Sequence, residues 1–173
     1  MNNIYFLLVT ILERVVVMKK VLLTILSILF VSISVFADDK QDALKAFNSY
    51  INDANTYSTN VTTYYTPSAK IIRQVIKPDG GLVDVVTDTA TYVKQLRISQ
   101  TVARTRKYTN NYTNVVVTPI SPGKVKISSV RHPSLDNDSL KVYMIFQKQP
   151  NGRWMIIEEM MQTRQQIFLK YAK

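Results

Sequence analysis

Apolar residues recur every three or four positions early in the chain and every second position later. Residues 38–57 follow the three- and four-residue steps of a helix that buries one face. The apolar positions of this segment are Ala43, Phe47, Tyr50, Ile51 and Ala54. Three aspartates lie near its start, where the helix dipole favours negative charge. We therefore predict an amphipathic helix over residues 38–57.

The middle of the chain predicts a hairpin followed by a second long helix. Residues 69–76 and 82–87 are rich in β-branched side chains and flank the turn sequence Lys77-Pro78-Asp79-Gly80-Gly81. Asp88 or Thr87 can cap a helix that runs to about Thr101. The side chains expected to face inward from that helix are Tyr92, Val93, Leu96 and Val102. The other predicted elements are a short helix over 61–65, strands over 106–118, 124–131, 140–148 and 153–162, and a helix over 164–173.

A late hairpin organises the predicted sheet. Pro150-Asn151-Gly152 is strong turn chemistry between two apolar, β-prone runs, Leu140–Phe146 and Trp154–Ile157. Strict alternation along the last strand places successive side chains on opposite faces. One face would carry Trp154, Ile156, Glu158 and Met160, and the other Met155, Ile157, Glu159 and Met161. Because both faces are largely apolar, we expect a central strand that is covered on both sides.

The first 37 residues have the pattern of a targeting segment. Met18-Lys19-Lys20 precedes the apolar run Val21–Phe36, and Ala37 completes a small-residue cleavage site. This order is typical of a secretory signal peptide. We expect cleavage after Ala37, a domain over residues 38–173, and a bacterial periplasmic or secreted location. The natural start would then be Met18, and an uncleaved anchor is the alternative.

Composition excludes several kinds of site. The chain has no cysteine, so disulfides, lipoprotein acylation and cysteine-based zinc sites are impossible. Its four glycines form no phosphate-binding loop, and we predict no cofactor. The formal charge of +10 favours acidic partners, but the basic residues are dispersed along the chain. Export would argue against nucleic acid as a partner, and no stable membrane span is expected after signal cleavage.

The order of elements indicates an α+β fold with N-terminal helices on one face of a curved antiparallel sheet. The ending Asn151-Gly152-Arg153-Trp154-Met155-Ile156 resembles the closing hairpin of the NTF2-like (SnoaL-like) superfamily, Asp/Asn-Gly-Arg/Lys-Trp-x-Ile. Residues 64–70 (YYTPSAK) are similar to its step from a helix into the first strand, and the resemblance covers about residues 43–162. It implies a cone with a pocket between helices and sheet, and a homodimer formed through the exposed sheet face. It says little about activity, because fold does not imply function.

The resemblance also implies where a pocket would be lined. Members that isomerise or dehydrate are expected to carry an acidic or histidine base and a tyrosine donor inside the cone. Glu158 is the candidate base in this chain. The expected pocket residues are Tyr50, Tyr64, Tyr65, Tyr92, Tyr112, Tyr143, Trp154 and Glu158. The alternative is that the tyrosines are core residues with hydroxyls at the rim, and that Glu158 emerges into solvent.

A second candidate site is basic. Arg97, Arg104, Arg106 and Lys107 gather at a helix end and the start of the next strand. They would either stabilise the helix C-terminus or form an anion-binding patch. His132 is the only histidine, so we predict no metal site. Asn110, Asn111 and Asn114 are unusual in a strand, where they would line a polar pocket wall or lie on a water-facing edge.

Three hypotheses for function follow. The first is an exported NTF2-like domain that binds a small molecule or a protein without catalysis. The second is a pocket enzyme similar to SnoaL or ketosteroid isomerase, with Glu158 as base. The third is a basic module that interacts with the cell envelope or an acidic protein.

Overall fold

The computed structural model describes residues 18–20 and 38–171. Residues 18–20 are helical and are treated separately from the compact unit that begins at Asp39. The predicted signal peptide and its cleavage site after Ala37 fall on residues that, apart from 18–20, lie outside the described part of the chain. No helix within the described ranges is long and apolar enough to cross a membrane.

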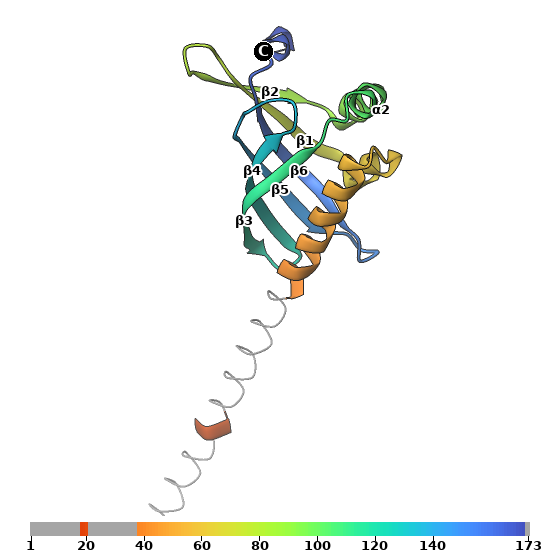
Figure 1. The fold of residues 1–173 in the computed structure, drawn as a ribbon. Coiled ribbons are helices and arrows are strands. Elements are labelled where there is room, and N and C mark those ends of the chain that lie inside the picture. Colours follow the sequence, from red (N-terminus) through yellow and green to blue (C-terminus); the bar gives the residue numbers. More distant parts are fainter. Residues whose placement is uncertain (1–17, 21–37, 172–173) are drawn as a thin grey trace, which may run out of the picture. The chain divides into compact units, whose positions relative to one another are not determined.

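The compact unit combines helices with one six-stranded sheet (Figure 1). The predicted N-terminal helix is confirmed and covers residues 38–55. The predicted hairpin is confirmed as well, and the N-cap of the long helix is Asp88, whose carboxylate accepts from the backbone N–H of Thr91. The elements that follow the first helix are η1 (Thr59–Tyr64), β1 (Tyr65–Ile76), β2 (Leu82–Thr87), α2 (Thr89–Thr105), β3 (Asn110–Ser121), β4 (Lys124–Pro133), β5 (Leu140–Lys148), β6 (Trp154–Thr163) and η2 (Gln166–Tyr171).

The strand order is β2-β1-β6-β5-β4-β3, and the sheet is mixed rather than wholly antiparallel. After β2, the chain crosses through α2 to the far edge of the sheet, and four antiparallel strands bring it back. The last of them, β6, therefore reaches β1 running in the same direction, with Tyr65 opposite Ile156. The expectation of an antiparallel sheet is wrong at this one pairing.

The first helix packs its apolar face against the inner face of the sheet (Figure 1). Phe47 is 1% exposed and meets Phe146 of β5 and Tyr112 of β3 edge to face, with ring centroids 6.4 and 5.6 Å apart. Alternate residues of β4 and β5 are buried, as a sheet covered on one face requires. The inward residues of β5 are Leu140, Val142, Met144 and Phe146.

A β-bulge in β6 changes which carboxylate faces inward. Phe146 of β5 pairs with Ile156, but its neighbour Ile145 pairs with Glu158, which leaves Ile157 as an extra residue. A bulge shifts the alternation of the residues that follow it. Glu159 is therefore on the buried side with Ile156, at 0% exposure, and Glu158 is on the other face. The face assignment predicted from strict alternation is wrong beyond Ile157.

Helix α2 runs one turn further than predicted and contacts the sheet mainly through its first half. Thr89 and Tyr92 are buried, whereas Val102 is 53% exposed and does not face inward as expected. Residues 106–109, expected to open a strand, instead follow the helix, and β3 begins at Asn110. The C-terminal segment forms the 3-10 helix η2 rather than an α-helix.

The packing of Phe47 predicts the cost of detaching the first helix. Phe47→Ala removes a fully buried ring and should lower the free energy of unfolding by about 3–5 kcal/mol. Val116→Ala, at a side chain that is 57% exposed, should change it by less than about 0.5 kcal/mol. Urea unfolding followed by the fluorescence of Trp154 measures both. Equal effects would contradict the core described here.

Candidate functional site

A cavity of about 610 Å³ lies between the first helix, α2 and the inner face of the sheet. Its walls combine aromatic rings with three guanidinium groups, those of Arg73, Arg131 and Arg164. Tyr50 comes from the first helix, Tyr92 from α2, Arg73 from β1, Tyr112 from β3 and Arg131 from β4. A cavity of this size with a few polar groups falls in the range of small-molecule sites, about 300–1,000 Å³.

Glu159 lies at the centre of a hydrogen-bond network behind the cavity wall. One carboxylate oxygen accepts from the Tyr65 hydroxyl at 2.5 Å. The other accepts from Arg73 Nη1 at 2.7 Å and from the Tyr92 hydroxyl at 3.2 Å. The Tyr65 oxygen also lies 3.0 Å from the Tyr50 hydroxyl. The network joins β6 to β1, α2 and the first helix.

The network keeps its tyrosines neutral and its arginine charged. Burial raises the pKa values of Tyr50 and Tyr65 well above the ordinary value, and the negative charge of Glu159 raises them further. Burial lowers the pKa of Arg73, but Tyr92 and Glu159 raise it by more, so its net shift is upward. The Arg73 guanidinium also lies 4.7 Å from the centre of the Tyr92 ring. Glu159 and Arg73 therefore form a buried ion pair surrounded by hydroxyl groups.

The structure separates the eight predicted pocket residues into two groups. Tyr50, Tyr92 and Tyr112 line the cavity. Tyr65 lies behind it at Glu159, and the Tyr64 hydroxyl donates to Asp53 at 2.8 Å. The residues outside the cavity lining are Tyr64, Tyr65, Tyr143, Trp154 and Glu158.

Glu158 does not face the cavity, so its assignment as a pocket base is wrong. The bulge at Ile157 turns it to the outer face of the sheet, where it accepts from the Tyr143 hydroxyl at 2.7 Å. Lys126 Nζ lies 4.1 Å from the centre of the same Tyr143 ring. These three side chains form a polar row on the outer face.

Arg131 is a cavity residue that the sequence interpretation missed. It is 9% exposed, and its guanidinium donates to the Tyr108 hydroxyl, Asn110 Oδ1 and the Gln162 carbonyl at 2.9, 2.9 and 3.0 Å. The alternation of buried residues along β4 would have placed it inside. Asn110 lines the cavity and Asn111 is exposed, while Asn114 has a positive φ of 53° beside a bulge in β3. Asn110 thus fits the interpretation as part of a polar pocket wall, and Asn111 fits the interpretation as a water-facing position.

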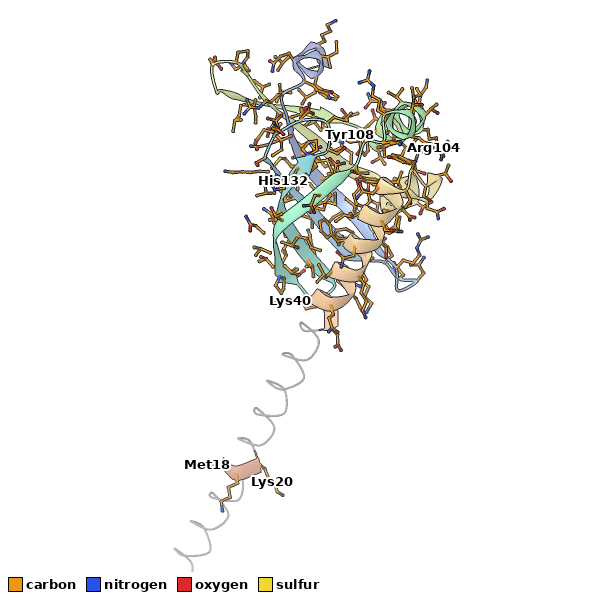
Figure 2. The ribbon with its side chains drawn as sticks, viewed as in Figure 1. Met18, Lys20, Lys40, Arg104, Tyr108 and His132 are labelled. Carbon is orange, nitrogen blue, oxygen red and sulfur yellow. The ribbon has the colours of Figure 1, made fainter. Side chains whose placement is uncertain are left out.

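The predicted basic patch consists of Arg97, Arg104, Arg106 and Lys107. All four of its residues are exposed. Arg104 is labelled on α2 in Figure 2 and lies seven residues after Arg97, on the same side of the helix. Its Nη2 donates to the Tyr57 carbonyl. Arg106 is the C-cap of α2 and lines a second cavity, which adjoins the first, and Lys107 follows with a positive φ of 53°.

His132 lies on β4 between two hydroxyl groups, with Nε2 2.8 Å from Thr113 Oγ1 and Nδ1 3.2 Å from Ser139 Oγ (Figure 2). Within residues 18–20 and 38–171, no group of three or more His, Cys, Asp or Glu side chains could hold a metal ion.

Solved structures of other proteins share this architecture. No protein-family profile and no curated protein sequence matches the chain. Solved structures do match. An uncharacterised Caulobacter vibrioides protein with a cystatin-like fold superposes with a TM-score of 0.55 at 10% identity, over 72% of this chain and 89% of that one. An NTF2-like protein of unknown function from Shewanella oneidensis gives 0.54 at 9% identity, over 71% and 98%. Nuclear transport factor 2 from Cryptosporidium parvum gives 0.50 at 14% identity, over 70% and 91%.

The protein has the NTF2-like fold. The resemblance carried by the closing hairpin is thus confirmed for the fold, including the α+β class and the helices packed on a curved sheet. At these identities the likeness extends to the fold and no further, and function has to come from the residues of this cavity.

The raised tyrosine pKa values predict a split alkaline titration. Tyr50, Tyr65, Tyr92, Tyr112 and Tyr143 have raised values, and that of Tyr64 is about 12. Absorbance at 295 nm should therefore show these six ionising later in the native protein than in urea. Because their folded pKa exceeds the unfolded value of about 10, the stabilisation is present below pH 10 and is lost above it. Native and unfolded curves that coincide would contradict the burial of these hydroxyls.

The ion pair predicts strong coupling between its members. Glu159→Gln alone leaves the Arg73 charge buried without a partner and should cost about 3–5 kcal/mol of stability. The double variant Glu159→Gln/Arg73→Met removes both charges and should cost less than the sum of the single changes, by about 0.5–3 kcal/mol. Chemical denaturation of the four proteins measures this difference. Additive effects would rule out the coupling.

Proposed function

We propose that this domain binds a small molecule in the cavity of its NTF2-like fold and does not catalyse a reaction there. The observation that carries the proposal is the cavity itself, about 610 Å³ with hydroxyl and guanidinium donors in a wall that includes five tyrosines. Such a wall favours a ligand that has both flat or apolar surface and hydrogen-bond acceptors.

The positions of the acidic groups support binding over catalysis. A general base has to come within hydrogen-bond reach of the proton it removes. Glu159 has no exposed surface and its oxygens already accept from Arg73 and two tyrosines. The acidic residues in the cavity lining are Asp136 and Asp138, from the loop before β5, and Asp138 pairs with Arg164 at 2.9 Å. In the described structure, none of these three carboxylates is at once free of other partners and in contact with a tyrosine of the cavity.

Native mass spectrometry of the protein purified from its own host tests the binding function. We expect the chain to carry a defined added mass. Ala103 lines the cavity from α2, and Ala103→Trp should remove that mass by filling the space. Ala90→Trp, at an exposed position on the same helix, is the matched control and should retain it.

Two results together would overturn the binding function. The first is that neither wild type nor Ala103→Trp carries an added mass, and the second is that a small-molecule library shifts the melting temperature of both proteins equally. Turnover of a cavity ligand by the wild type would instead favour the enzyme hypothesis.

Export and a homodimer remain predictions, and the same sample checks both. The segment with the signal-peptide pattern supports export, for which N-terminal sequencing should begin at Asp38. A dimer through the outer sheet face would give twice the chain mass. A chain that retains residues 1–37, or a monomer at micromolar concentration, would contradict the respective prediction.

A further inference from the structure

Arg131 and Arg73 both line the cavity but differ in how their charge is balanced. Arg73 is paired with the fully buried Glu159. Among residues 18–20 and 38–171, Arg131 forms no ion pair, although it is only 9% exposed. Its partners are a hydroxyl, an amide oxygen and a backbone carbonyl, all neutral. A buried charge without a counter-charge lowers the stability of the fold, so the burial of an unpaired Arg131 needs a physical reason.

The Arg131 guanidinium is held rigidly by its neighbours. Asn110 Oδ1 accepts both from Arg131 and from the Tyr108 hydroxyl. Asn110 is itself fixed by two backbone hydrogen bonds to the Asn55 side chain, each 2.9 Å long. A side chain locked by such contacts is ready to bind without further ordering, which strengthens ligand binding.

Arg131 also retains unused donors. A guanidinium has five N–H donors, and three hydrogen bonds are made here. Its Nε is buried and has no hydrogen-bond partner in the described structure. An anion that enters the cavity beside Arg131 would supply both the missing counter-charge and acceptors.

Arg131 carries the one buried charge in the described cavity lining that no ion pair balances. Arg73 is neutralised by Glu159, and Arg164 by Asp138. The remaining charged lining residues are Arg131 and Asp136, which is exposed on the loop before β5. A carboxylate matches one guanidinium, whereas a doubly charged phosphate would place excess negative charge near two aspartates.

A second cavity of about 570 Å³ continues from the first along α2. The two share five wall residues, Ser99, Ala103, Tyr108, Asp136 and Gln165. The second cavity exposes large apolar side chains: Ile98 is 66% exposed, Val102 53% and Leu135 51%. Ile98 and Val102 are four residues apart on one side of α2, and Leu135 comes from the loop before β5. An apolar chain in this groove would cover them.

Tyr108 connects the two features. It follows α2 and precedes β3 (Figure 2), lines both cavities and accepts from Arg131 at 2.9 Å. The unpaired Arg131 guanidinium is thus hydrogen-bonded to a residue of the wall that the polar cavity and the apolar groove share.

We infer that the ligand is an amphiphilic carboxylate, with its head group at Arg131 and its aliphatic tail in the groove formed by Ile98, Val102 and Leu135. Because it concerns the same cavity, this ligand class rests on the proposed binding function. The two features meet at Tyr108, and this meeting points to one ligand that spans both.

The head group is tested with dodecanoate against dodecanamide, its uncharged analogue of equal length. Isothermal titration should show wild type binding dodecanoate about 10–100-fold more tightly, as expected for a charged hydrogen bond. Arg131→Met should abolish this preference, and Arg97→Met, an exposed control on α2, should keep it. A thermal melt of each variant reports its folding, and the comparison of two ligands on wild type needs no variant.

The tail is tested at an exposed position that folding does not need. Ile98→Asp should weaken dodecanoate about tenfold or more and leave short-chain butanoate unchanged. Equal binding of dodecanoate and dodecanamide by wild type, a preference that survives in Arg131→Met, or dodecanoate binding that ignores Ile98→Asp would each overturn the inference.

These failures are distinguishable from failure of the proposed function. If a retained mass is lost in Ala103→Trp while dodecanoate shows no dependence on Arg131, the cavity binds a different class of ligand and only the amphiphile is excluded. If wild type neither retains a mass nor binds dodecanoate, both the ligand class and the binding function are overturned.

Discussion

The full burial of Glu159 is the constraint on which the arrangement of this domain depends. A carboxylate without access to water is tolerated only when its oxygens are hydrogen-bonded and its charge is balanced. Here β1 supplies Arg73 and Tyr65, and α2 supplies Tyr92. The Tyr92 contact fixes α2 against the sheet, together with Thr89, whose buried hydroxyl donates to the Ala69 carbonyl of β1. Glu159 does not itself line the cavity, but its hydrogen bonds to Arg73 and Tyr92 hold two of the lining residues in place.

Two of the three arginines that line the cavity then have separate roles. Arg73 belongs to the buried network, where Glu159 balances its charge. Arg131 is held by Tyr108 and Asn110 through neutral contacts and keeps its charge. A fold that many unrelated functions share acquires its chemistry from such differences, which depend on single side chains and not on topology.

Local features of the fold were predictable because the residues that cause them are adjacent in sequence. The Asp88 cap, the Asp79-Gly80-Gly81 turn and the Pro150-Asn151-Gly152 turn each carry their own geometry. The site was less predictable. Strand β6 is apolar on both faces, so nothing in its pattern marks Ile157 as a bulge, and the inward carboxylate was taken to be Glu158 instead of Glu159. Whether the charge of Arg131 is paired depends on which groups approach it from other strands.

The place of β6 in the sheet has a consequence for when the domain can fold. β6 lies between β1 and β5, and it joins the β1–β2 hairpin to the antiparallel strands β3–β5. Tyr65 finds its partner only at Ile156, so this pairing has a long loop to close and high contact order. Without β6, the β1–β2 hairpin and the strands β3–β5 would be two separate half-sheets. Arg73 lies on one half and Arg131 on the other, so the cavity requires the pairing of β6 with both of its neighbours.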